Sequence, residues 1–414
     1  MPGDEGREVE IEASNMAHGG VSVARLEGRV VFVPDVIPGE RLRARITDDR
    51  KRSFWRAEAL EVLDPSPYRR PHPWPEASLD RAPEDRAGGA DYGHIVPEHQ
   101  RRLKAGVLRD ALERTGRIER DTVVEEVPGP ADGMGWRTRV RLHVDDDGRL
   151  GPMAARSHRV IRVDDVPLAV PALRAAVPLE ERFAGIRTVD ALAPGIGDPR
   201  LVVGDQAPTV IRERVGNREF RLDDTGFWQV HPAAADVLTA AVQDAVDPAL
   251  LDPAAANLDL YGGVGLLAAA LGDLTEGIRI TTVESDERAS EHAAENLAEW
   301  VGAAAVAARV ERWVRGLADA SAAERDRLRR ATVVLDPPRS GAGREVLDAI
   351  AAAHPAQIVY VACDPVALAR DARILLEHGY DLASLRAFDL FPSTHHVEAV
   401  AAFRSGLEAR KRVR

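Results

Sequence analysis

The chain has 414 residues, a formal net charge of −12 and a hydrophobic fraction of 45%, so it is too long for one ordinary core and we expect two or three domains. Its single cysteine excludes a disulfide framework and a four-thiolate metal or iron–sulfur site, and its acidity disfavours a nucleic-acid coat protein, though not an enzyme with a local basic groove. No stretch predicts a signal peptide or a membrane-spanning helix, so we expect a cytoplasmic protein without membrane contact.

Residues 1–68 predict a small all-β domain. Short apolar or alternating runs are separated by turns rich in Gly, Pro and Asp, and the clearest runs lie at 21–26, 29–33, 41–46 and 55–62. About five strands in a stretch of this length suit an OB-type barrel, a fold that commonly binds single-stranded nucleic acid.

Basic residues gather in the second half of this predicted barrel, next to Phe54 and Trp55. They are Arg41, Arg43, Arg45, Arg50, Lys51, Arg52 and Arg56. These residues are either an RNA-binding face with aromatic stacking or a solvated edge whose aromatic residues belong to the core. Composition favours neither interpretation.

Residues 69–215 predict a second, β-rich domain. An alternating run at 137–144 predicts a strand, and a turn signal follows it. Three arginines share one face of that strand, as either a phosphate-facing row or an ordinary charged surface: Arg137, Arg139 and Arg141. Residues 96–120 include a helical pattern of apolar positions.

Residues 216–414 predict a doubly wound α/β domain of the Rossmann type, because strand and helix patterns alternate. The predicted strands lie at 256–261, 278–284, 331–336 and 358–363, followed by an antiparallel pair at 385–390 and 397–403. The whole chain is therefore predicted to be an α/β protein with a barrel, a central β-rich domain and this larger domain.

The first of these strands leads into the turn Gly-Gly-Val-Gly at 262–265 and then into an Ala/Leu helix. Such a turn lets a nucleotide approach the backbone and the helix N-terminus. Glu284 ends the next strand about 20 residues further on, where a carboxylate can bind two ribose hydroxyls. The turn also fits NAD, but the Asp-Pro-Pro-Arg sequence at 336–339 is typical of base methyltransferases that use S-adenosylmethionine.

Cys363 ends a β-branched apolar strand. Asp364 and Pro365 follow it and predict the N-cap and the first residue of a helix. Cys363 therefore lies where open α/β sheets bind ligands. A lone cysteine at that position is either a small buried hydrophobic residue or a nucleophile.

These motifs together resemble the RNA (uracil-5-)-methyltransferases, nearly from end to end. The region at 18–40 resembles the TRAM domain of that family, an OB-type barrel. The matching motifs of the catalytic domain lie at 227–231, 258–265, 336–341, 360–365 and 389–398.

The resemblance implies transfer of a methyl group from S-adenosylmethionine to C5 of a uridine in ribosomal or transfer RNA. Cys363 would add to C6 and Glu398 would be the general base. It also implies that residues 96–120 pack on the catalytic domain. Because the iron–sulfur cysteines of the family are missing from this chain, we expect no metal. The cofactor-binding residues that the resemblance implies are Gln229, Tyr261, Gly263, Gly265, Glu284 and Asp336, the last of which could hold the uracil edge instead.

The chain departs from the family at its iron–sulfur site. The four cysteines of that site fall on Trp74, Ala87, Ala90 and Val166, so we expect a variant without the cluster. We expect a monomer that acts on RNA, and the TRAM-like barrel favours ribosomal over transfer RNA, because transfer-RNA members often lack it.

Two other classes of function stay open. One is an RNA-binding protein with a vestigial methyltransferase fold, which the intact Cys363, Glu398, Asp336 and Gln229 disfavour. The other is a methyltransferase for another base or a nicotinamide enzyme. Neither of these needs a nucleophilic cysteine, and the Asp-Pro-Pro-Arg turn fits hydride transfer poorly.

Overall fold

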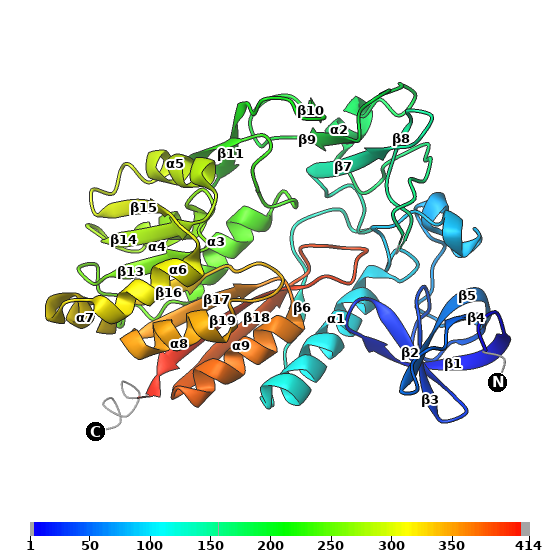
Figure 1. The fold of residues 1–414 in the computed structure, drawn as a ribbon, viewed down its shortest axis with the longest axis horizontal. Helices are drawn as coiled ribbons and strands as arrows, with labels where there is room; N and C mark the ends of the chain where they lie inside the picture. Colours follow the sequence, from blue (N-terminus) through cyan, green and yellow to red (C-terminus); the bar gives the residue numbers. More distant parts are fainter. Residues whose placement is uncertain (1–3, 156, 407–414) are drawn as a thin grey trace.

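The computed structural model describes residues 4–155 and 157–406 (Figure 1). In Figure 1 an N-terminal barrel, a central β unit and a larger α/β unit follow one another along the chain. Within the described ranges, no helix has the length and apolar character needed to cross a membrane.

The N-terminal unit is a closed five-stranded barrel with strand order β1-β2-β3-β5-β4, which confirms the predicted OB-type barrel. Side chains alternate between buried and exposed along β1 and β4, as expected for a barrel wall. A parallel pairing of β3 with β5 closes it. The strands are β1 (Glu8–Ala17), β2 (Val21–Leu26), β3 (Arg29–Val33), β4 (Arg41–Asp48) and β5 (Phe54–Asp64).

The larger unit contains an eight-stranded sheet with the order β15-β14-β13-β16-β17-β19-β18-β6. The first five strands in this order are parallel, and β19 pairs antiparallel with both β17 and β18. The strands are β6 (Val124–Glu125), β13 (Asn257–Leu260), β14 (Ile280–Glu284), β15 (Ala303–Ala307), β16 (Thr332–Leu335), β17 (Gln357–Ala362), β18 (Tyr380–Phe388) and β19 (Glu398–Ser405).

Helices cover both faces of this sheet, which confirms the doubly wound fold. One apolar cluster joins the sheet to α6, α8 and α9, and a second joins it to α3 and α4. Every residue of β13, β16 and β17 is buried, as expected for strands covered on both sides. The helices are α3 (Ala234–Ala245), α4 (Leu266–Gly272), α5 (Glu287–Asn296), α6 (Val310–Arg315), α7 (Ala322–Arg329), α8 (Gly343–Ala353) and α9 (Pro365–Glu377), with a short turn at Gly316–Asp319.

The central unit contains a four-stranded sheet with the order β10-β9-β7-β8. It also includes short helical turns at Pro75–Ala77 and Pro83–Asp85. Its strands are β7 (Arg139–Val144), β8 (Leu150–Gly151), β9 (Thr188–Leu192) and β10 (Arg200–Val203), and its helix is α2 (Pro171–Ala176).

A separate hairpin of β11 (Val210–Val215) and β12 (Arg218–Asp223) follows the central sheet. Its apolar side chains pack into the same cluster as α3 and α4. The domain boundary predicted at residue 215 falls in the turn of this hairpin. The division into 1–68, 69–215 and 216–414 stays a prediction, and the shared core favours a boundary before β11.

Helix α1 (Pro97–Ala111), with its continuation at Leu112–Gly116, packs against α9 and the sheet, although it precedes the central unit in the chain (Figure 1). Its buried Lys104 donates to Asp389 at 2.5 Å and to the Phe391 carbonyl at 3.0 Å. Gln100 on the same helix accepts from the Ser393 N–H at 2.8 Å. Helix α1 thereby fixes the loop between β18 and β19, which leads directly to Glu398.

Candidate active site

Three predicted cofactor residues lie side by side at the carboxyl ends of neighbouring strands. Leu260 of β13 is in register with Val283 of β14 and with Leu335 of β16. The next residues along these parallel strands are Tyr261, Glu284 and Asp336. Parallel register therefore brings them to one edge of the sheet, where open α/β sheets bind ligands.

Cys363 and Glu398 meet at the adjacent strand pair. Strands β17 and β19 are antiparallel, with Ala362 opposite Ala399. The next step in this register sets Cys363 opposite Glu398. Cys363 is half-buried and the Glu398 side chain is buried, while Asp364 and Pro365 begin α9 as the sequence predicts.

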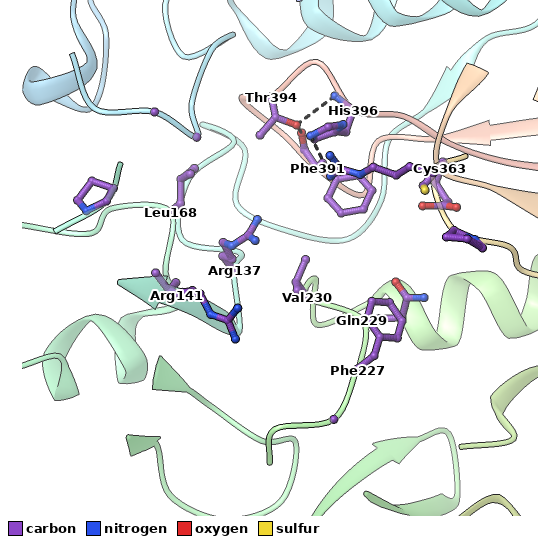
Figure 2. Close-up of a pocket in the computed structure, with 18 of the residues that line it drawn as sticks. Arg137, Arg141, Leu168, Phe227, Gln229, Val230, Cys363, Phe391, Thr394 and His396 are labelled. Carbon is purple, nitrogen blue, oxygen red and sulfur yellow. Dashed lines mark hydrogen bonds between the residues drawn. The ribbon is translucent and has the colours of Figure 1, made fainter. Parts of the chain in front are cut away.

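A single cavity of about 1620 Å³ joins these residues (Figure 2). Its wall includes all of the predicted site residues except Gly265, namely Gln229, Tyr261, Gly263, Glu284, Asp336, Cys363 and Glu398. Gly265 instead begins α4 with a φ of +90°, and an added Cβ would lie 3.2 Å from the Leu297 side chain. Gly265 therefore shapes the turn, and its predicted part in cofactor binding stays a prediction.

The cofactor side of this cavity fits the nucleoside part of S-adenosylmethionine. Gly263 has a φ of +53°, and an added Cβ would meet nothing within 4 Å, so its backbone is open to a ligand. The Glu284 carboxylate accepts from the Gly263 N–H at 3.0 Å and from the Asp286 N–H at 2.8 Å. A fixed carboxylate beside an open glycine turn is the arrangement that binds ribose hydroxyls.

The charges at the catalytic side are unbalanced. Burial, with a contribution from Asp259, raises the pKa of Asp336 to about 7. Burial, followed by the charge of Asp336, raises the pKa of Glu398 well above its ordinary value, and Arg339 opposes this. Burial, followed by Glu398 and Asp336, raises the pKa of Cys363 to about 12. Clustered perturbed groups of this kind are typical of functional sites.

Residues that the sequence left without a role form a network beside Cys363. His395 Nδ1 lies 2.5 Å from Asp91 Oδ2, and the rings of His395 and His396 have centroids 4.0 Å apart. His396 Nε2 lies 3.2 Å from Arg339 Nη2. No local pattern could have found this network, because it joins a loop near residue 91 to another 304 residues away.

The four positions aligned with iron–sulfur cysteines come together in the structure. Trp74, Ala87, Ala90 and Val166 are all buried in one apolar cluster of the central unit, and all four line the large cavity. In the described part of the chain, no group of three or more His, Cys, Asp or Glu side chains could hold a metal ion.

The predicted basic patch of the barrel divides into two parts. Arg41, Arg43 and Arg45 of β4 pair with carboxylates of the neighbouring strands, the shortest of these contacts being 2.8 Å. Lys51 and Arg56 instead lie over the Phe54 ring, 5.3 and 5.9 Å from its centroid. Among the described residues, no carboxylate pairs with either of these two cations.

The arginine row of β7 divides in the same way. Arg139 pairs with Glu213 at 3.3 Å, and Arg141 pairs with Asp190 at 2.7 Å. Arg137 donates to the Arg139 carbonyl and lines the cavity, without a carboxylate partner in the described ranges (Figure 2). The row is therefore mostly an ordinary paired surface, with one cation left facing the cavity.

Comparison with known proteins identifies the family. The model of the tRNA (Uracil-5-)-methyltransferase family matches residues 220–404, and the TRAM domain model matches residues 4–60. An RNA methyltransferase of Streptomyces avermitilis is 38% identical, with 96% of this chain and 98% of that protein aligned. A 23S rRNA (uracil(1939)-C(5))-methyltransferase of Alkalilimnicola ehrlichii is 29% identical over 95% of this chain and 96% of that protein.

A solved structure has the same fold over almost the whole chain. The tRNA (uracil-54, C5)-methyltransferase of Pyrococcus abyssi, in complex with S-adenosyl-L-homocysteine, superposes with a TM-score of 0.67 and 21% identity, covering 95% of this chain and 99% of that one. The family resemblance and the enzyme class predicted from the sequence are thus confirmed. The chain belongs to the S-adenosylmethionine-dependent RNA (uracil-5-)-methyltransferase family and carries an N-terminal TRAM domain.

Proposed function

We propose that the protein methylates C5 of a uridine in RNA through a covalent adduct between Cys363 and C6 of the base. The observation that carries this proposal is the facing position of Cys363 and Glu398 on β17 and β19. They share one cavity with the Glu284 and Gly263 cradle that fits the cofactor. A nucleophile, a base and a nucleotide site in one cavity are what this chemistry requires.

The reaction needs each of these groups because C5 of uracil is a poor nucleophile. The Cys363 sulfur forms a bond to C6, and C5 becomes enolate-like. When bound, S-adenosylmethionine supplies an electrophilic methyl group. Glu398 then accepts the proton from C5, the C5–C6 double bond forms again, and the bond between C6 and Cys363 breaks to release the thiolate.

The remaining site residues hold the two substrates. We assign Gln229, Tyr261, Gly263 and Glu284 to the cofactor because they line its side of the cavity. Asp336 directly follows β16, which lies between β13 and β17 in the sheet, so its carboxyl group can reach the cofactor amine or the uracil edge. A target base inside a folded RNA must be flipped out of its stack to enter this cavity.

We further propose that ribosomal RNA is the substrate and that the active form is a cytoplasmic monomer. The closed barrel and the relative that acts on 23S rRNA support a ribosomal target. A monomer would suffice for the reaction, because a single chain brings the predicted site residues together in one cavity. Lys51 and Arg56, which have no carboxylate partner in the described part of the chain, lie beside Phe54 and give the barrel a surface suited to single-stranded RNA.

RNA that contains 5-fluorouridine tests both the chemistry and the substrate. Its C5 carries fluorine in place of the hydrogen that the base must remove, so the covalent adduct with the enzyme cannot break down. The protein is incubated with S-adenosylmethionine and 5-fluorouridine-substituted ribosomal or transfer RNA. We expect a denaturation-resistant adduct with ribosomal RNA that disappears in Cys363→Ser. An adduct with transfer RNA alone would overturn the substrate assignment. No adduct and no methyl transfer with either RNA would overturn the reaction.

A further inference from the structure

One side chain of the barrel reaches the catalytic strand. His18 follows β1 in the turn to β2, and its Nε2 lies 2.7 Å from Asp364 Oδ2. Asp364 is the chain neighbour of Cys363. Its other oxygen, Oδ1, accepts from the backbone N–H groups of Val366 and Ala367 at 3.0 and 2.8 Å. One carboxylate thus caps α9 and binds the barrel at the same time.

A second, smaller cavity of about 250 Å³ lies between the barrel turn and the catalytic strand. His18, Gly19 and Gly20 line it from the barrel, and Cys363 and Asp364 line it from the sheet. Because Cys363 also lines the large cavity, it stands in the wall between the two. The thiol is therefore bordered by the barrel on one side and by the cofactor cavity on the other.

The barrel turn is seated tightly in this position. Gly20 has a φ of +72°, and an added Cβ would lie 2.7 Å from Asp91 Oδ2 and 2.8 Å from the His395 Cβ. Only glycine fits so close to the network beside the active site. The packing at Gly20 therefore fixes the turn that carries His18, whereas the His18 side chain itself is exposed and is held to Asp364 by their hydrogen bond.

The charges at this contact bear on the thiol. The hydrogen bond to Asp364 raises the pKa of His18. Burial alone would raise the pKa of Asp364, but the bonds from His18 and the α9 backbone lower it overall. The carboxylate of Asp364 is one of the groups that raise the pKa of Cys363, after burial, Glu398 and Asp336, and Arg339 opposes them.

We propose that His18 is a positioning residue for Cys363: its protonated imidazole holds Asp364 in place and offsets the carboxylate charge beside the thiol. Docking of the barrel thereby makes the nucleophile easier to ionise, a role that rests on the function proposed above for Cys363. The other ionisable groups that line the smaller cavity are Tyr92, Arg339, His395 and His396, and the wall of the large cavity adds Asp91, Asp336 and Glu398 near Cys363. Among the described residues, His18 forms an ion pair with Asp364 and with none of these other groups.

The reaction of Cys363 with iodoacetamide tests this role without any RNA, because Cys363 is the only cysteine and the thiolate is the reacting form. The full-length protein is compared with His18→Gln, which keeps a hydrogen-bond donor but no charge, and with His18→Lys, which keeps a positive charge. The matched control is His378→Gln, which removes a similar pair with Asp348 at 2.8 Å on the far end of α9.

Below the pKa of His18 we expect alkylation of His18→Gln to be about threefold slower than that of the wild type, because a neighbouring positive charge favours the thiolate. The two rates should converge at higher pH, where the wild-type imidazole is neutral. His18→Lys should keep the fast rate to higher pH, and His378→Gln should follow the wild type throughout.

Equal rates for the wild type and His18→Gln at every pH would overturn the inference. An equal loss of alkylation rate in His18→Gln and His18→Lys would show that His18 acts only as a structural contact and that its charge has no effect on Cys363. Failure of the proposed reaction is seen separately, as a missing adduct with 5-fluorouridine RNA, whereas alkylation depends only on the thiol. Thermal unfolding of each variant identifies any that fail to fold.

Discussion

At the methyltransferase side of the large cavity, Glu398 is a buried acid and Asp336 a half-buried one, and neither has a cation within ion-pair distance among the described residues. At the side of the central unit, Trp74, Ala87 and Val166 form an apolar wall of the same cavity. Buried unpaired acids cost stability, whereas buried apolar groups contribute it. The difference indicates that the first side is kept for chemistry and the second for folding. Substitutions at the two sides should therefore change different measurements.

The largest effect is expected for Glu398→Gln. Removing the proposed general base should lower the methylation rate by about 10²- to 10⁴-fold. The adduct with unmodified RNA should accumulate in the presence of S-adenosylmethionine, because its breakdown needs loss of the C5 proton. The melting temperature should stay equal or rise, because a buried acid is replaced by a neutral amide.

Glu213→Gln is the control for that variant, since Glu213 is also buried but does not line the cavity. It should lose stability, because the change weakens the ion pair of Glu213 with Arg139, but at a temperature where it is folded its methylation rate should stay within about twofold of the wild type. A normal rate in Glu398→Gln, measured by transfer of labelled methyl to RNA, would remove Glu398 from the mechanism.

Trp74→Ala should show the opposite result, a loss of stability with little change in the methylation rate. Truncating this buried indole should cost about 3–5 kcal/mol of unfolding free energy, as in other Trp-to-Ala changes in cores. The methylation rate at a temperature where the variant is folded should change little. Urea unfolding followed by the methylation assay measures both quantities.

Trp74→Phe tests the same role of this apolar wall in stability with a smaller change in volume. The Trp74 Nε1 is buried without a hydrogen-bond partner in the described structure, so replacing the indole by a phenyl ring removes an unsatisfied donor. We expect a smaller loss of stability than in Trp74→Ala. Loss of activity in both variants, with their stability preserved, would contradict the division between the two sides.

Asp336→Asn should change the pH dependence of stability, which can be compared with the pH dependence of the methylation rate. The pKa of Asp336 is raised from 3.8 to about 7 in the folded protein, so its protonated form stabilises the fold. This contribution is fully present below about pH 4 and is lost as pH rises through 7. Between pH 4 and pH 8, the free energy of unfolding of Asp336→Asn should rise relative to that of the wild type by a few kcal/mol, on the order of 1.4 kcal/mol per pKa unit.

Urea unfolding at several pH values measures this difference. A constant difference between Asp336→Asn and the wild type would show that Asp336 is ionised throughout. The methylation rate of the wild type should rise with pH over the same range, because in the proposed mechanism the Cys363 thiol and the Glu398 carboxyl act in their ionised forms and both have raised pKa values.

The sequence predicts the catalytic sheet well because its signals are local. Buried β-branched runs mark β16 and β17, and short motifs after the strands mark Glu284, Asp336 and Cys363. Parallel register then brings these positions together, so that local patterns are enough to collect the site.

Contacts between distant segments could not be predicted in this way. The contact of His18 with Asp364 joins residues 346 positions apart, and it depends on how the barrel docks. The pairing of Arg43 and Arg45 with Glu8 depends on the register of β1 with β4. Composition therefore showed a basic patch in the barrel but not which of its charges were already neutralised.

The barrel gives the smallest expected effect and tests the same distinction between paired and unpaired charge. Lys51→Ala and Arg56→Ala should each weaken RNA binding by about three- to tenfold and lower the salt dependence by about one counterion. Arg43→Ala and Arg45→Ala are the matched controls, because their charges are balanced by carboxylates. Their RNA affinity should stay within about twofold of the wild type, because a paired surface cation offers little net charge to phosphate. Filter binding at two salt concentrations measures both quantities, and equal losses in all four variants would mean that the whole patch, paired or not, contacts RNA.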